Sequence, residues 1–97
     1  MHIANVTVKS TWQDLESLIS SATGSVFYFD SSKNYYLVND GVNTVYCVNK
    51  EGEAPTELPP LGMPLALQEQ AGLKLATGKV YVATQHGTAN LHIEVEA

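Results

Sequence analysis

The stretch that decides the fold class is residues 79–96, KVYVATQHGTANLHIEVE. Apolar and polar residues alternate in 91–96, a period of two that is typical of half-buried β-strands, and the apolar-rich segment 79–84 precedes them across a short polar break. With His86-Gly87 as a two-residue loop, the two strands form an antiparallel hairpin in which apolar residues oppose apolar residues. The expected pairs are Val82 with Leu91, Val80 with Ile93, Thr84 with Ala89, Lys79 with Glu94, and Tyr81 with His92.

The same period predicts strands earlier in the chain. Residues 3–8 place Ala4, Val6 and Val8 on one side, and the aromatic run 26–29 predicts a second strand. Turn-forming residues at 30–34 follow that run.

A second hairpin is predicted around Asp40-Gly41, because this dipeptide favours the type I′ turn. In the resulting register Tyr35 faces Tyr46, and Cys47 becomes a thiol in the core. The aromatic content of these strands is explained by packing, since aromatic residues favour β-structure.

A short helix is predicted between residues 10 and 24. Ser10 with Gln13 has the spacing of a capping box, and Gly24 ends the helix. An apolar stripe of about two turns follows helical spacing, with Trp12 as the expected anchor on a sheet. Its members are Trp12, Leu15, Leu18 and Ile19.

Regular structure lapses over residues 49–62, where prolines and glycines are interspersed with Glu51, Glu53 and Glu57. Pro64 restricts any strand there to a sheet edge. The residue types of 68–77 favour a helix, but Gly72 and the alternation of Leu73 and Leu75 favour a short strand, which we expect. We therefore expect residues 1–97 to form one mainly β domain, a small antiparallel β-sandwich or β-barrel-like fold. It would contain six to eight short strands in two packed sheets and one short N-terminal helix.

Composition excludes several classes of function. Ten Asp and Glu against five Lys give a formal net charge of −5, and the sequence contains no Arg. Neutralising phosphates needs clustered basic residues, so we expect neither nucleic acid nor an anionic membrane surface as a partner. The lone Cys47 allows no intrachain disulfide, and the N-terminal residues lack the pattern of an export signal.

Few residues are candidates for metal ligands or catalytic groups. Only His86, His92 and Glu94 resemble a cluster of metal ligands. His92 and Glu94 would point to the same side of a strand about 7 Å apart and could hold a metal only with a third ligand from elsewhere, so a solvated strand face explains them better. Cys47 lies among apolar residues rather than beside a cation or helix N-terminus that would make it reactive. We expect no catalytic residue, no metal, no cofactor and no enzymatic activity.

Two surface features remain as candidates for recognition. An exposed platform of Tyr35 and Tyr46 would suit a glycan, although packing accounts for these side chains more simply. An apolar, proline-rich loop suggests a partner surface, or a segment folded back over an open end of the sandwich. The candidate interface residues of this loop are Leu58, Pro59, Pro60, Leu61 and Met63.

The order of features resembles the head-decoration or head-fibre type of small virion structural proteins of tailed bacteriophages. The resemblance rests on Trp12-x-x-Leu15-x-x-Leu18, Tyr36-x-Val38-Asn39, Ala54-Pro55-Thr56 with Gly62, Val80-Tyr81-Val82, and Gly87-Thr88-Ala89-x-Leu91-x-Ile93-x-Val95. The acidic central loop and Pro59-Pro60 depart from it. It implies a non-enzymatic, homo-oligomeric β-module that is made in the host cytoplasm and decorates or projects from a capsid in the virion. Its partners would be itself, as a dimer or trimer, and a capsid or other virion protein. The alternative is a glycan- or ligand-binding module of a tail or surface assembly.

Overall fold

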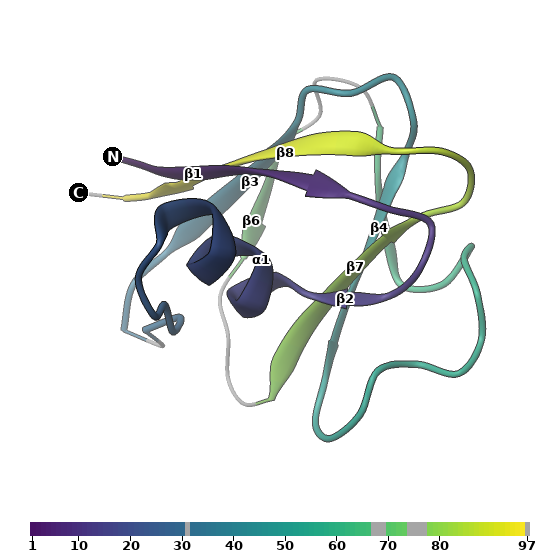
Figure 1. The fold of residues 1–97 in the computed structure, drawn as a ribbon, viewed down its shortest axis with the longest axis horizontal. Helices are drawn as coiled ribbons and strands as arrows, with labels where there is room; N and C mark the ends of the chain where they lie inside the picture. Colours follow the sequence, from purple (N-terminus) through teal and green to yellow (C-terminus); the bar gives the residue numbers. More distant parts are fainter. Residues whose placement is uncertain (31, 67–69, 74–77, 97) are drawn as a thin grey trace.

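In the part of the chain that the structure describes, the fold consists of two four-stranded antiparallel sheets and one helix (Figure 1). The computed structural model describes residues 1–30, 32–66, 70–73 and 78–96. The first sheet has the order β1 (His2–Val8), β8 (Ala89–Val95), β3 (Tyr35–Asn39) and β6 (Gln70–Leu73). The second has the order β2 (Gln13–Asp14), β7 (Lys79–Thr84), β4 (Val45–Lys50) and β5 (Met63–Leu65), and the helix is α1 (Leu15–Thr23). The expected mainly β architecture of two packed sheets with one short helix is confirmed.

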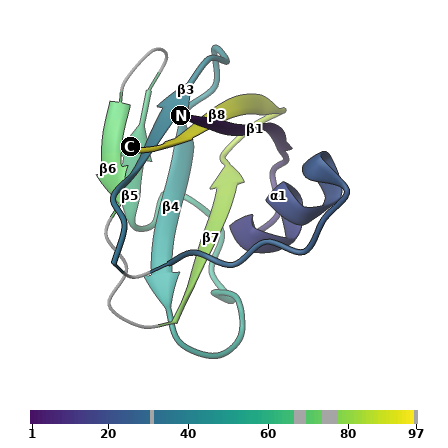
Figure 2. The same ribbon diagram turned by 90° about the vertical axis from the view of Figure 1, so that its left-hand side faces the viewer.

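The core lies between the two sheets, which face each other in Figure 2. The predicted inward side of β1 is confirmed, because its alternate residues Ala4, Val6 and Val8 are buried. Val82 of β7 and Leu91 of β8 are fully buried in the same core, although they come from opposite sheets. Apolar side chains from both sheets therefore form one shared hydrophobic core.

The predicted C-terminal hairpin is wrong in its pairing. β7 and β8 belong to different sheets: β7 pairs with β4 and β2, whereas β8 pairs with β1 and β3. Val80 and Ile93 are both buried as expected, but they face the core from the two sheets and do not share a ladder. Val80 and Ile93 are buried whether the two strands pair in a hairpin or face each other from two sheets. The sequence pattern could not distinguish these arrangements, so it favoured the simple hairpin.

The predicted hairpin at Asp40-Gly41 is also wrong, because β3 and β4 lie in different sheets. Gly41 does not have a positive φ; a Cβ there would instead lie 2.8 Å from the Cα of Ala89. The buried Asn39 organises the crossover, since its Nδ2 donates to the carbonyl oxygens of Asn43 and Leu65, both at 2.8 Å. The glycine thus permits a close approach between the crossover and β8 rather than a tight turn.

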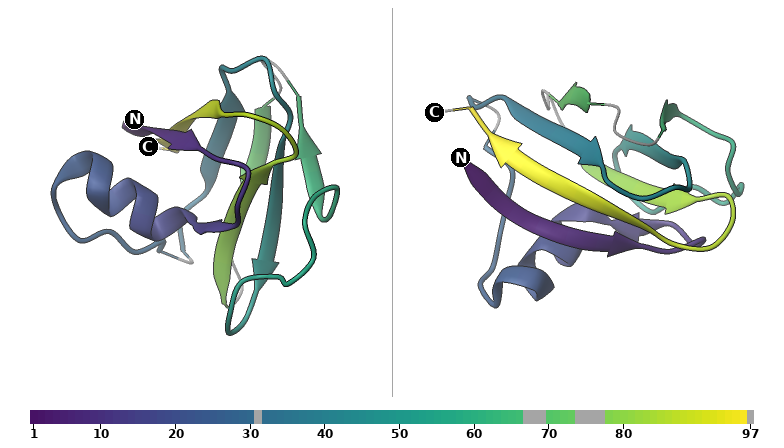
Figure 3. Two further views of the ribbon diagram at one scale, coloured as in Figure 1. Left: turned by 45° about the vertical axis from the view of Figure 1, so that its right-hand side comes forward. Right: turned by 90° about the horizontal axis from the view of Figure 1, so that it is seen from above.

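The helix begins four residues later than predicted. Asp14, not Ser10, is its N-cap, and Asp14 Oδ1 accepts a hydrogen bond from the Glu16 N–H at 3.0 Å. Gln13 lies in β2 and its side chain accepts from the Lys9 N–H, so Ser10 and Gln13 form no capping box. Gly24 ends the helix as predicted, in the left-handed conformation. Figure 3 shows α1 beside the sheets, where it packs against β1, β2 and β7.

The middle of the chain follows the sequence more closely. Residues 51–62 contain no strand or helix, but Asn49 and Lys50, where regular structure was expected to lapse, are the last residues of β4. As predicted, β5 with Pro64 is an edge strand. β6 at 70–73 confirms the strand expected there, while residues 68, 69 and 74–77 of that prediction lie outside the described part of the chain. Across the described ranges, no helix has the length and apolar character needed to cross a membrane.

Candidate functional site

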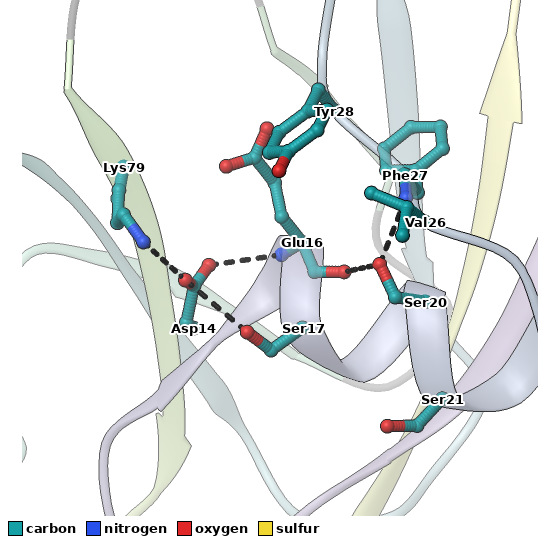
Figure 4. A pocket seen from close by; sticks show the side chains of 9 residues that line it. All are labelled: Asp14, Glu16, Ser17, Ser20, Ser21, Val26, Phe27, Tyr28 and Lys79. Carbon is teal, nitrogen blue, oxygen red and sulfur yellow. Dashed lines mark hydrogen bonds and ion pairs between the residues drawn. The ribbon is translucent and has the colours of Figure 1, made fainter.

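An extended segment at residues 25–30, which we call the aromatic strap, runs beside α1 and forms one side of a pocket (Figure 4). The strand predicted at 26–29 is wrong, because this segment belongs to no sheet. The alternation itself is real: Phe27 and Phe29 are half-buried and pack on the core, whereas Val26 and Tyr28 are 77% and 75% exposed. The strap therefore has the side-chain pattern of a strand without a strand partner.

Side chains of α1 take the place of that missing partner. Ser20 Oγ accepts a hydrogen bond from the Phe27 N–H at 2.9 Å, and Glu16 Oε2 accepts one from the Phe29 N–H at 2.7 Å. Ser20 and Glu16 lie one helical turn apart and therefore on the same face of α1. Two alternate amides of the strap are thus satisfied by one face of the helix, and the intervening Tyr28 points away from the core.

The far end of the strap is fixed by Tyr35. This side chain is only 3% exposed, and its hydroxyl oxygen accepts a hydrogen bond from the Asp30 N–H at 2.8 Å. Its ring packs edge-on against Phe29, with centroids 4.8 Å apart, and against Phe27 at 6.3 Å. The hydroxyl and backbone amide of Ser32 both donate to Asp30 and lower the pKa of that carboxyl group. The strap is consequently held at three points along its length.

The pocket between α1 and the strap has a volume of about 360 Å³. Its lining residues are Asp14, Glu16, Ser17, Ser20, Ser21, Val26, Phe27, Tyr28 and Lys79. In Figure 4, Lys79 reaches in from β7 and Asp14 from the start of the helix. The lining combines an aromatic ring, hydroxyl groups and both signs of charge.

Asp14 and Lys79 form an ion pair in this pocket, with Nζ and Oδ2 2.9 Å apart. The hydrogen bond and the charge of Asp14 raise the pKa of Lys79, so its ammonium group stays protonated at neutral pH. Ser17 Oγ donates to the same carboxylate oxygen at 3.4 Å. The predicted opposition of Lys79 and Glu94 is wrong, because these residues lie in different sheets.

The structure does not bring together the predicted pair Tyr35 and Tyr46. Tyr35 is buried in β3 of the first sheet, whereas the half-buried Tyr46 lies in β4 of the second. The register that would have made them neighbours is therefore wrong, for the same reason as the hairpin on which it depended. Tyr46 instead lines a second pocket of about 220 Å³ with Val42, Asn43, Thr44, Gln85 and His86.

The predicted interface residues lie on the loop before β5 and, in the case of Met63, at the first residue of β5. Leu58 is 68% exposed, Met63 is 38% exposed, and Pro60 is exposed, whereas Pro59 is buried and Leu61 is half-buried. The loop thus divides into side chains that hold it to the domain and side chains that face solvent. The Pro59-Pro60 peptide bond is cis.

His92 and Glu94 share the outer side of β8 as predicted, with Nε2 and Oε1 3.5 Å apart. The residue that sequence reasoning missed is His2, whose ring stacks on His92 with centroids 4.5 Å apart. Asn5 Oδ1 lies 3.0 Å from His92 Nδ1 and 3.4 Å from His2 Nε2. His86 lies in the second pocket, and no group of three metal-ligating side chains is found in the residues that the structure describes.

Cys47 is a core thiol, as predicted. It is buried in β4, and burial raises its pKa to about 12. A thiolate is the nucleophilic form, so this side chain is unreactive in the folded state at neutral pH.

Comparisons with protein families, with curated proteins and with solved structures gave no match.

Sequence reasoning also missed Tyr28 and Lys79 as pocket residues. The run 26–29 carried a signal, since its alternation required one side to face solvent or a partner. The sequence did not show that the preceding helix would be this partner, because hydrogen bonds from side chains to backbone amides follow no simple spacing along the chain.

Proposed function

We propose that this chain is a non-enzymatic structural subunit that self-associates through residues 58–63, which we call the apolar loop. In the assembled particle it would decorate or project from a phage capsid, in line with the resemblance of its sequence features to small virion proteins. The observation that supports this most is Leu58, a large apolar side chain that is 68% exposed on a loop anchored to the domain.

The anchoring is made by side chains of the second sheet and of its flanks. The Trp12 indole Nε1 donates to the Glu57 carbonyl oxygen at 2.6 Å, directly before Leu58. The Tyr81 hydroxyl donates to the Gly52 carbonyl oxygen at 2.6 Å, and Lys50 Nζ donates to that of Glu53 at 3.0 Å. Binding to a loop that is already ordered loses less conformational entropy, which favours association.

The end of the loop is fitted closely to β4. A Cβ on Gly62 would lie 2.6 Å from the Val48 side chain, and Gly62 has a φ of 84°. The buried Pro59 gives the loop a further attachment. Leu58 and Met63 are therefore presented to solvent on either side of anchored residues, as expected of a preorganised contact surface.

Edge-to-edge pairing through β5, the edge strand that follows this loop, is a less suitable mode of association. The edge strand β5 has three residues, and its central Pro64 has no N–H to donate to a neighbouring strand. Contact between copies would instead use the apolar side chains of the loop. Exposed Glu51, Glu53 and Glu57 nearby would repel an acidic second copy, so association should strengthen as salt screens the charges.

The test is the solution mass of the chain, measured by size exclusion with light scattering over a wide range of protein concentration. We expect a dimer or trimer for the unmodified chain and a shift toward monomer for Leu58→Ser. Val42→Ser is the matched control, because Val42 is an aliphatic side chain outside the apolar loop that is even more exposed than Leu58, at 82%. A monomer at every concentration, or an equal effect of both variants, would contradict the proposal.

The capsid contact is tested separately, by co-sedimentation with purified capsids that lack decoration. A capsid partner should offer an apolar recess bordered by Lys or Arg, complementary to Leu58 and the glutamates around it. Binding that Leu58→Ser weakens and Val42→Ser leaves unchanged is the expected result. If the chain self-associates but does not co-sediment with capsids, the proposed capsid contact is wrong and the chain belongs to another kind of self-assembled particle.

A further inference from the structure

We infer that the pocket between α1 and the aromatic strap is a binding site for a neutral carbohydrate, with Tyr28 as the stacking platform. This site lies apart from the apolar loop, and none of the candidate interface residues lines it. The inference therefore goes beyond self-association and does not depend on it.

Tyr28 supplies the surface that a sugar ring needs. Its side chain is 75% exposed, so one face of an aromatic ring is open at the pocket. The C–H-rich face of a pyranose packs on such a ring, and the phenol hydroxyl offers a hydrogen bond at its rim. Figure 4 shows Tyr28 over the same hollow that the polar side chains of α1 and β7 enter.

The polar groups of the pocket suit hydroxyl groups on a ligand. An ammonium group has three N–H donors, and Lys79 uses one on Asp14. Ser17 and Ser21 contribute hydroxyls that both donate and accept. Glu16 holds the strap through Oε2 and has Oε1 as a second acceptor. A sugar hydroxyl, which is itself donor and acceptor, matches this mixture.

The charge of the pocket favours a neutral sugar over the main alternative ligand, a phosphate or other anion. Two carboxylates, Asp14 and Glu16, and one ammonium, Lys79, line the pocket, so its formal charge is negative. Asp14 also occupies the N-terminus of α1, where an anion would otherwise bind. A neutral ligand is accommodated without repulsion, whereas an anion is opposed.

The platform is held in place before any ligand arrives. The residues on both sides of Tyr28 donate their amides to Ser20 and Glu16, and Asp30 donates to the buried Tyr35. Tyr35 thus supports the strap from inside, while Tyr28 presents its ring outside. A site supported in this way binds at lower entropic cost. Its volume of about 360 Å³ is near the lower end of ligand pockets, which suits one or two sugar rings and weak, millimolar binding.

The experiment is an NMR titration of the ¹⁵N-labelled full chain with glucose, galactose, N-acetylglucosamine, cellobiose, maltose and chitobiose. We expect at least one of these sugars to shift the amide resonances of the strap and of the first turn of α1. Tyr28→Ala should weaken the fitted Kd by about tenfold through loss of the stacking surface, and Tyr28→Phe should retain most of the affinity. Because Tyr28 is exposed, neither variant should disturb the fold.

Tyr46→Ala is the matched control, since Tyr46 lines the second pocket. Loss of sugar binding in Tyr46→Ala with none in Tyr28→Ala would place the site elsewhere and overturn the inference. So would the absence of shifts with every sugar, or stronger binding of inorganic phosphate than of any sugar. The solution mass of Tyr28→Ala should equal that of the unmodified chain, and Leu58→Ser should bind sugar normally, so the two proposals can fail independently.

Discussion

The indole nitrogen of Trp12 lies 2.6 Å from the carbonyl oxygen of Glu57, 45 residues away in the sequence. This hydrogen bond joins the segment before β2 to the loop that carries Leu58. Trp12 therefore anchors a loop to the domain, whereas the sequence suggested that it would anchor a helix on a sheet. The position of the most exposed leucine of the described chain depends on this contact.

Trp12→Phe removes the indole N–H and keeps an aromatic ring. We expect the free energy of unfolding to fall by about 1 kcal/mol, the usual value of one hydrogen bond, together with faster amide hydrogen exchange in residues 51–62. Denaturant unfolding and hydrogen-exchange mass spectrometry measure the two effects. Unchanged exchange in the loop would show that Trp12 does not hold it.

Gly41→Ala tests the crossover between the two sheets. A Cβ at this position would meet Ala89 Cα at 2.8 Å and Asn90 N at 3.0 Å, so the backbone of β8 or of the crossover must move. We expect a loss of about 1–3 kcal/mol in the free energy of unfolding, as for overpacking in a core. The measurement is chemical denaturation.

Gly52→Ala is the comparison for Gly41→Ala. Nothing lies within 4 Å of a Cβ at Gly52, but its φ of 81° is left-handed, so the cost there is conformational, about 1 kcal/mol. If Gly41→Ala were tolerated without loss, the close approach of the crossover to β8 would be refuted.

Asp14 has two separable roles, as the N-cap of α1 and as the ion-pair partner of Lys79. Asp14→Asn retains a capping oxygen and removes the charge, while Asp14→Ala removes both. We expect Asp14→Ala to cost about 1 kcal/mol through the lost cap and Asp14→Asn to cost clearly less, since solvent screens the ion pair of the exposed Lys79. Thermal unfolding of both variants ranks them. Equal losses in the two variants would assign the stabilisation to the ion pair, since the charge is the only feature that both remove.

Burial of Cys47 predicts a loss of stability at high pH. Its pKa is raised from 9.0 to about 12 in the folded chain. Above pH 9 the unfolded state therefore releases the thiol proton while the folded state retains it. The unfolded state then binds fewer protons, and the free energy of unfolding falls by about 1.4 kcal/mol per pH unit until the folded thiol also ionises near pH 12. Below pH 9 the group contributes no pH dependence.

Cys47→Val keeps a buried apolar side chain without the ionisable group. Urea unfolding of both proteins between pH 8 and pH 10.5 should give a shallower pH dependence for the variant, whatever the difference in absolute stability. Identical slopes would mean that the thiol is not buried in the folded state. Thiol-reactive reagents should label Cys47 only as fast as the chain opens.

The sequence predicts burial in this fold better than it predicts partners. Alternation identified the inward residues of β1 and β8, including Val6 and Leu91, because a half-buried strand needs one apolar side whatever its neighbour. Alternation did not predict that β7 is buried on both sides, from Val80 to Thr84. It gave the wrong neighbours for β7 and β8, since a hairpin and a pair of facing strands in two sheets bury the same side chains. Pairing depends on contacts distant in sequence, which no local pattern records.

For the candidate sites, too, local features could be predicted from the sequence, whereas contacts between distant residues could not. The exposed positions Leu58 and Met63 followed from an apolar run in a segment without regular structure. The pocket did not follow, because Lys79 and Asp14 are 65 residues apart and meet only through the pairing of β2 with β7. Packing was the simpler explanation for Tyr35 and a platform the alternative; Tyr35 is buried and supports the strap that exposes Tyr28.

The measurement that tests the central claim most directly is the solution mass of the unmodified chain and of Leu58→Ser, over a wide concentration range and at low and high salt. We predict a dimer or trimer that grows stronger with salt, that Leu58→Ser disrupts and that Val42→Ser does not. A chain that remains a monomer at every concentration and salt level would contradict self-association through the apolar loop.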